Sequence, residues 1–108
     1  MRGAGVVIEQ DPARTRVRLA GEVDGSTRGL SAAALARVVA RGVPVELDLA
    51  GVRFLDSAGV ALLVRCWRTC TEAGVPCAVT VVSEPAERVL RLVGLAGALG
   101  VPEPAPAR

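Results

Sequence analysis

The stretch VELDLAGVRFLDSAG, from Val45 to Gly59, decides the fold of this chain. Val45, Leu47 and Leu49 alternate with acidic residues. This period-two pattern is typical of a strand with one buried face and one face that is partly exposed to solvent. Ser57 then lies where a long helix is expected to begin, among backbone N–H groups without intrahelical partners and at the positive end of the helix dipole. Such a position suits a hydroxyl or a phosphate, so Ser57 is either a helix cap alone or also a switch.

An antiparallel hairpin is expected before this stretch. Residues 5–10 and 16–20 are apolar or alternating runs that flank a turn-rich connection of hairpin length. Ser26 or Thr27 is then predicted to cap a helix that continues to about Arg41. A strand, a helix and a further strand imply a right-handed parallel crossover.

Two more helices and one strand are expected after the stretch. Residues 58–73 have helical spacing, residues 77–82 form a short apolar strand, and Ser83 is predicted to cap a third helix. The side chains predicted to face the sheet are Val60, Leu63, Trp67 and Cys70 on the first of these helices and Val89, Leu92 and Val93 on the second.

The order of these elements predicts an α/β fold, in which about three helices pack against a mixed sheet of about four strands. A chain of 108 residues, about half of them apolar, is sufficient for one domain with a modest core. We expect residues 1–99 to form this domain and residues 100–108 to form a tail rich in Pro and Ala.

Composition disfavours nucleic acid and membrane as direct partners. The formal net charge is +2, every basic residue is Arg, and Phe54 and Trp67 are the two aromatic residues, so there is neither a basic stripe nor a set of stacking aromatics. The apolar run near the N-terminus is too short for a signal peptide or a membrane span. These features predict a cytoplasmic protein that does not insert into a membrane.

The same inventory argues against an enzyme. The chain has no His, Lys or Tyr, so a Ser57 nucleophile would need Asp or Glu as its base, and no glycine precedes it in the GxSxG sense. No P-loop or GxGxxG motif is present either, and no cofactor is expected.

Two clusters of possible metal ligands have simpler interpretations. Acidic side chains near the predicted strand ends could gather a divalent cation, but solvated turn and capping carboxylates are the default interpretation. The three cysteines lack the spacing of a zinc site or a disulfide framework, and core filling is the default for them. The acidic residues are Glu22, Asp24, Asp48 and Asp56, and the cysteines are Cys66, Cys70 and Cys77.

The first turn of the central helix carries mostly small side chains after Ser57. Ala58, Gly59 and Ala61 put small residues in its first turn, where glycine costs up to about 1 kcal/mol relative to alanine. A bare helix start beside a hydroxyl suits the close approach of another protein or of a kinase active site, although close packing within the fold would also select small residues. Asp56 and Ser57 are both favoured capping residues, so capping alone is the other interpretation.

These motifs resemble a known family. Gly21-Glu22-Val23-Asp24 before a capped helix, then VELDLAGVRFLDSAG, then Gly74 before a strand, resemble the STAS domains of bacterial anti-sigma factor antagonists. The likeness spans about residues 5–95. Members of that family are small single domains with a mixed sheet and helices packed against it, and they regulate transcription.

The resemblance implies a mechanism. In the family, an anti-sigma factor with a histidine-kinase-like ATPase fold binds the unphosphorylated antagonist, and this binding frees the sigma factor. The same partner phosphorylates the serine in the position of Ser57, and a phosphatase reverses the reaction. By the same matching, Asp24 and Asp56 lie near the phosphoacceptor. We therefore expect a monomer whose partner interface includes Ser57, Ala58, Gly59 and Ala61.

Two alternatives stay open. The short C-terminal end also resembles the STAS subunits of bacterial ABC-type phospholipid-transport complexes, which bind an ATPase subunit and act structurally, so a non-switching subunit of such a transport or other signalling complex is the second hypothesis. The third is an enzyme that uses a metal or a nucleotide at Asp24 and Asp56, against which the missing catalytic side chains argue.

Overall fold

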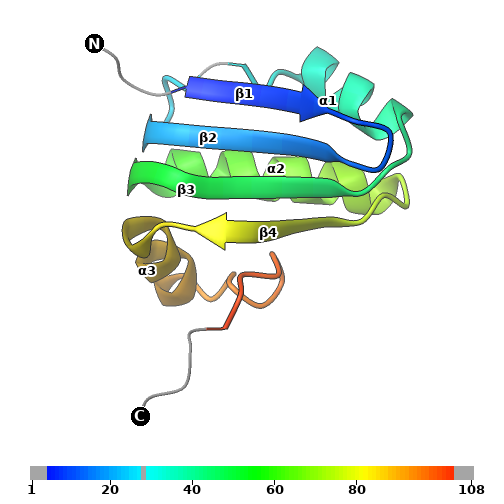
Figure 1. Cartoon of the computed structure of the whole chain (residues 1–108). Coiled ribbons are helices and arrows are strands. Elements are labelled where there is room, and N and C mark those ends of the chain that lie inside the picture. The colour runs from blue at the N-terminus through cyan, green and yellow to red at the C-terminus, as the bar shows by residue number, and fades with distance from the viewer. Residues whose placement is uncertain (1–4, 28, 104–108) are drawn as a thin grey trace.

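The computed structural model describes residues 5–27 and 29–103, which form a four-stranded sheet and three helices (Figure 1). The sheet order is β1-β2-β3-β4; β1 is antiparallel to β2, and the other two pairs are parallel. This confirms the predicted α/β fold with a mixed sheet. The strands are β1 (Gly5–Gln10), β2 (Thr15–Val23), β3 (Val45–Leu55) and β4 (Cys77–Val82), and the helices are α1 (Ala32–Ala40), α2 (Ser57–Glu72) and α3 (Glu84–Leu92).

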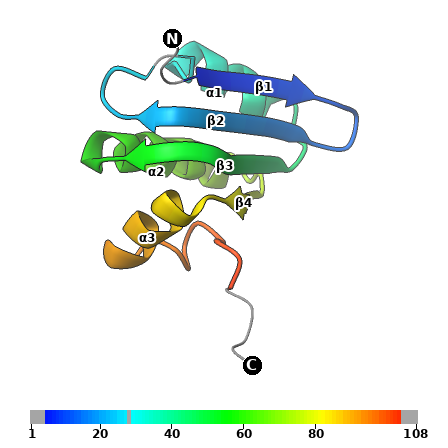
Figure 2. The ribbon, with the colours of Figure 1, turned by 60° about the vertical axis from the view of Figure 1, so that its left-hand side comes forward.

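One face of the sheet is covered by helices. Helices α1 and α2 lie side by side behind it, and α3 lies at its β4 edge (Figures 1 and 2). The inward side chains of the two central strands are fully or nearly fully buried. On the opposite face, Glu46 pairs with Arg14 and Arg16, and Arg18 pairs with Glu9 and Asp48. The inward residues of β2 and β3 include Val17, Leu19, Val23, Leu47 and Leu49.

Strand β3 is longer than its alternating residues predict, and this places the end of the central stretch. It continues through Leu55, with irregular pairing to β2 where Gly51 passes Ala20; a Cβ on Gly51 would lie 3.0 Å from the Cβ of Ala20. The two strands finish together, because Val23 pairs with Leu55 and Val23 accepts a hydrogen bond of 3.4 Å from the backbone N–H of Asp56. The helix that follows therefore starts directly beside the end of β2.

Helix α1 begins later than predicted. The expected caps, Ser26 and Thr27, instead make hydrogen bonds inside the β2–α1 loop, and Ser31 caps the helix by accepting from the N–H of Ala34 at 3.1 Å. Gly29, with φ of 103°, interrupts any helix that started at the earlier residues. The prediction of the helix start was wrong because the loop uses the side chains that the sequence offers as caps.

The inward face of α2 is confirmed. Val60, Leu63 and Cys70 are buried and Trp67 is half-buried against the core, as the helical spacing predicts. At 16 residues this is the longest helix in the described part of the chain. Neither α2 nor any other helix of the described residues combines the length and the apolar character that crossing a membrane requires.

The inward face of α3 was predicted wrongly in part. Ser83 caps the helix as expected, accepting from the N–H of Ala86 at 3.3 Å. The buried residues are Ala86 and Leu90, four residues apart on one face, while Leu92 is 81% exposed and Val93 53% exposed. Hydrophobicity alone misplaced the stripe, because successive residues of a helix are about 100° apart and Leu92 therefore points away from the side that Leu90 buries.

The segment after α3 packs along the free edge of β4. Leu99 and Val101 are buried, and the carbonyl of Leu99 accepts a hydrogen bond of 2.8 Å from the N–H of Val79. The boundary expected after residue 99 stays a prediction, and residues 104–108 of the expected tail lie outside the described residues.

Candidate functional site

Asp56 and Ser57 lie at the start of helix α2. The helix is capped by Asp56 and not by Ser57, where a cap was expected. Asp56 has extended backbone angles and is the N-cap; its Oδ1 accepts from the N–H of Gly59 at 2.9 Å. Ser57 is the first residue of the helix. The capping role proposed for Ser57 is thus carried by Asp56, and the serine side chain is not needed for it.

The Ser57 hydroxyl is accessible. The residue is exposed, and its Oγ makes no hydrogen bond to any other residue within 5–27 and 29–103. It stands at the positive end of a 16-residue helix, where added negative charge is favoured by the helix dipole. The Ser57 hydroxyl is therefore open to solvent and is not engaged by the described residues.

Gly59 has an internal structural reason to be glycine. It is buried, and a Cβ added there would lie 2.2 Å from the carbonyl oxygen of Val23 and 2.7 Å from Cδ1 of Leu55. The first turn of α2 packs directly on the end of β2. Ala58 and Ala61 are exposed, so they are the small residues of this turn that another molecule can reach.

The loop that follows β2 holds Asp24 as a fixed negative charge. Asp24 Oδ1 accepts from the N–H of Ser26 at 2.8 Å and from its hydroxyl at 2.6 Å. These two hydrogen bonds, the side-chain one first, hold the pKa of Asp24 below its usual value. Thr27 closes the loop, because its hydroxyl accepts from the N–H of Asp24 at 2.9 Å and donates to the carbonyl of Glu22 at 3.3 Å.

The loop and helix α2 line an open groove of about 430 Å³. Asp24, Ala58 and Ala61 line it, and Gly25 lies against Ala58, since a Cβ on Gly25 would be 3.6 Å from the Cβ of Ala58. The structure thus brings three of the predicted site residues to one groove. Asp56, Ser57 and Gly59 are not in its lining: the first two lie at the helix start next to Ala58, and Gly59 is buried below them.

Sequence reasoning missed Arg65 as a member of this groove. Arg65 lines the groove, and its Nη2 donates to the carbonyl of Leu30 at 2.6 Å, which ties the loop before α1 to α2. Its signal in the sequence is its spacing from Ala58 and Ala61, which puts all three residues on one stripe of the helix. Among the described residues, the lining of the groove therefore includes the negative Asp24 and the positive Arg65 together with small residues.

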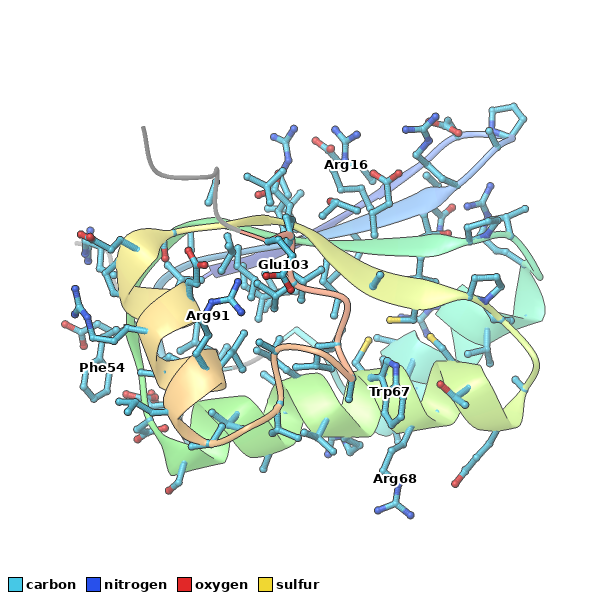
Figure 3. All side chains as sticks on the ribbon, turned by 90° about the horizontal axis from the view of Figure 1, so that it is seen from below. Arg16, Phe54, Trp67, Arg68, Arg91 and Glu103 are labelled. Atoms are coloured by element: carbon cyan, nitrogen blue, oxygen red, sulfur yellow. The ribbon has the colours of Figure 1, made fainter. Side chains whose placement is uncertain are left out.

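Phe54 is an exposed aromatic residue near the start of α2. It is 50% exposed, three residues before Ser57, and its ring points away from the body of the domain (Figure 3).

Three of the acidic residues considered as possible cation ligands accept hydrogen bonds from nearby backbone N–H groups. Asp24, Asp48 and Asp56 each accept a hydrogen bond from an N–H two or three residues further along the chain. Asp48 also pairs with Arg18 on the open face of the sheet. The carboxylates therefore shape turns and a helix start.

The division of roles at the start of α2 predicts different effects of two substitutions. Asp56→Ala removes the hydrogen bond to Gly59 and should lower the free energy of unfolding by about 1 kcal/mol. Ser57→Ala removes an exposed hydroxyl that makes no bond to the described residues, so the change should stay within about 0.5 kcal/mol. Urea denaturation of both variants measures this difference. A larger loss for Ser57→Ala than for Asp56→Ala would contradict the assignment of the cap.

The structure thus combines a mixed sheet with an exposed serine at the start of helix α2, which docks on the ends of β2 and β3. The chain matches the family model described as "Mlab, STAS domain" over residues 6–101. It belongs to the STAS domain family. No curated protein matches the sequence.

Two solved structures have a similar fold. A crystal structure of an anti-sigma factor antagonist from Mycobacterium paratuberculosis aligns with a TM-score of 0.71 and 24% identity, covering 90% of this chain and 83% of that one. The anti-sigma factor antagonist SpoIIAA in its unphosphorylated form aligns with a TM-score of 0.60 and 19% identity, covering 86% and 84%. At these identities the likeness establishes the shared fold.

Proposed function

We propose that this chain is an anti-sigma factor antagonist, a protein-binding domain that is switched by phosphorylation of Ser57. The observation that carries the proposal is the Ser57 hydroxyl, which is exposed at the start of α2 and makes no hydrogen bond to the described residues. The fold shared with two anti-sigma factor antagonists supports it. When Ser57 is unmodified, the domain binds an anti-sigma factor kinase and a sigma factor is released.

The proposed binding surface surrounds the helix start. Ser57, Ala58 and Ala61 are exposed and present little side-chain bulk, so a partner can approach the backbone of the first turn. Gly59 supports this surface from below, because its missing Cβ lets the turn pack on Val23. Phe54 adds an exposed aromatic ring nearby.

The switch acts through charge at the interface. Phosphorylation adds about −1.5 to −2 charges and three acceptor oxygens. The N-terminus of α2 tolerates this group, and the fold of the domain therefore changes little. The added charge stands beside Asp56 and near the loop that holds Asp24, so the negative charge of this surface increases, and a partner fitted to the unmodified surface is repelled.

The other parts of the proposal follow from this role. The domain is the substrate of its partner's kinase activity and not itself an enzyme, and it needs no cofactor. A phosphatase restores the unmodified state. The protein acts as a cytoplasmic monomer, with residues 1–99 as the binding domain.

Affinity capture from native lysate tests the proposal. Wild type, Ser57→Ala and Ser57→Asp serve as baits, and the retained proteins are identified by mass spectrometry. We expect wild type and Ser57→Ala to retain the same ATPase-fold partner and Ser57→Asp to retain much less. Retention of the same partner by all three baits at equal yield would contradict the switch.

A second candidate is a non-switching STAS subunit of an ABC-type phospholipid-transport complex or another signalling complex. The observation that favours it is the family match, whose description is "Mlab, STAS domain" and contains no reference to anti-sigma factors. This candidate predicts co-purification with a membrane-associated ATPase and no phosphate on Ser57. Intact mass of the natively purified protein separates the two candidates, since a shift of one phosphate favours the antagonist.

A further inference from the structure

Three thiols meet at the end of the domain away from Ser57. Cys66 and Cys70 lie on α2, and Cys77 is the first residue of β4. Their Sγ atoms all lie within 4.8 Å of one another, and the sulfur atoms gather between α2 and β4 (Figure 3). Core filling needs no such convergence, since any three small apolar side chains would fill the same space.

The fold holds this cluster from both sides. Cys66 and Cys70 are four residues apart and therefore share one face of α2. The carbonyl of Cys70 accepts from the N–H of Val75 at 2.8 Å, which fixes the turn into β4, and Cys77 is paired with Val45 of the central strand. Cys66 and Cys70 are buried and Cys77 is only partly so, which leaves a route from solvent at Cys77.

The donor set selects the metal. Thiolates are soft ligands that favour Cu(I) or Zn²⁺, and closed zinc sites take four ligands. The chain has no His, and the described residues that form this cluster are three Cys without a carboxylate. A metal–sulfur distance of about 2.3 Å puts the sulfurs of a planar three-coordinate site about 4 Å apart, which these thiols reach by small side-chain rotations.

We propose that Cys66, Cys70 and Cys77 bind one Cu(I) ion as a three-thiolate site. The ion bonds to the three sulfurs, and the thiol protons leave to solvent.

Anaerobic titration of the full chain with Cu(I), supplied as its acetonitrile complex, tests the site. Competition with bicinchoninate gives the affinity and stoichiometry, and the single Trp67, three residues from Cys70, reports binding by fluorescence. We expect one Cu(I) per chain, three sulfur ligands by X-ray absorption, and a rise in Tm of roughly 10 °C at a free Cu(I) concentration about 100 times Kd.

Cys77→Ser is the matched variant, because Cys77 is only partly buried and serine nearly preserves its shape. Circular dichroism and the Tm without metal establish that it folds. Its Cu(I) affinity should fall more than about 100-fold, since loss of an outer-shell partner alone costs 10- to 100-fold. Equal affinity in the two proteins, two sulfur ligands in the wild type, or preference for Zn²⁺ over Cu(I) would each overturn the proposal.

Discussion

Gly59→Ala is expected to destabilise the domain by about 3 kcal/mol, although alanine is the better helix former by up to about 1 kcal/mol. The new Cβ would lie 2.2 Å from the carbonyl oxygen of Val23 and 2.9 Å from its carbonyl carbon. Leu55 can rotate its Cδ1 away, but the backbone of Val23 is held by its pairing with Leu55 and by the hydrogen bond from Asp56. The start of α2 must therefore move off the sheet.

Thermal and urea unfolding measure this effect, and Tm should fall on the order of 15 °C. Gly97→Ala is the matched control, because a Cβ at Gly97 meets no atom within 4 Å and the residue has no positive φ. It should change stability by less than about 0.5 kcal/mol. A Gly59→Ala protein as stable as Gly97→Ala would show that α2 does not dock on β2 in this way.

Ser57→Asp is expected to weaken binding to the anti-sigma factor partner by about 3 kcal/mol, roughly 100-fold, if the proposed switch is correct. Aspartate places a negative charge at the exposed helix start next to Asp56, while the fold is unaffected because the position is solvent-exposed and near the positive end of the helix. Ser57→Ala should bind as tightly as wild type. Isothermal titration calorimetry with the captured partner measures all three affinities.

The control for charge alone is Thr71→Asp. Thr71 is exposed on the last turn of the same helix, about 20 Å from Ser57 along the axis, so the substitution adds the same net charge away from the proposed surface. Its affinity should equal that of wild type. Equal weakening by Thr71→Asp and Ser57→Asp would assign the effect to net charge and not to the site.

The sheet was predictable because its signal is local. Val45, Leu47 and Leu49 alternate with acidic residues, and in the structure they face the core while Glu46 and Asp48 pair with Arg side chains on the open face. The alternation of apolar and acidic residues predicts which face of the strand is buried, and it does so without information from the rest of the fold. The same holds for the hairpin of β1 and β2.

The helix ends and faces depended on information that the sequence does not contain locally. Ser26, Thr27 and Ser31 are all acceptable caps, and the loop around Asp24 decides that only Ser31 serves α1. On α3, Leu90 and Leu92 are equally apolar, and the direction from which the sheet edge approaches decides that Leu90 is buried.

The candidate site was predicted in part. Its serine and its small residues were identified from the motif, but Gly59 had two possible explanations until the position of the Val23 carbonyl was known. Arg65 is part of the site because the loop before α1 folds over α2. This tertiary contact cannot be predicted from residue spacing along the helix. The meeting of Cys77 with the α2 cysteines depends in the same way on the α2–β4 turn.

The most direct test of the central claim is phosphate transfer from ATP to this chain by the partner that it captures, with the modified residue located by fragmentation mass spectrometry. The account predicts one phosphate, on Ser57, with none on the Ser57→Ala protein, and loss of binding by the modified form. A phosphate on another residue, or full binding by protein phosphorylated on Ser57, would contradict it.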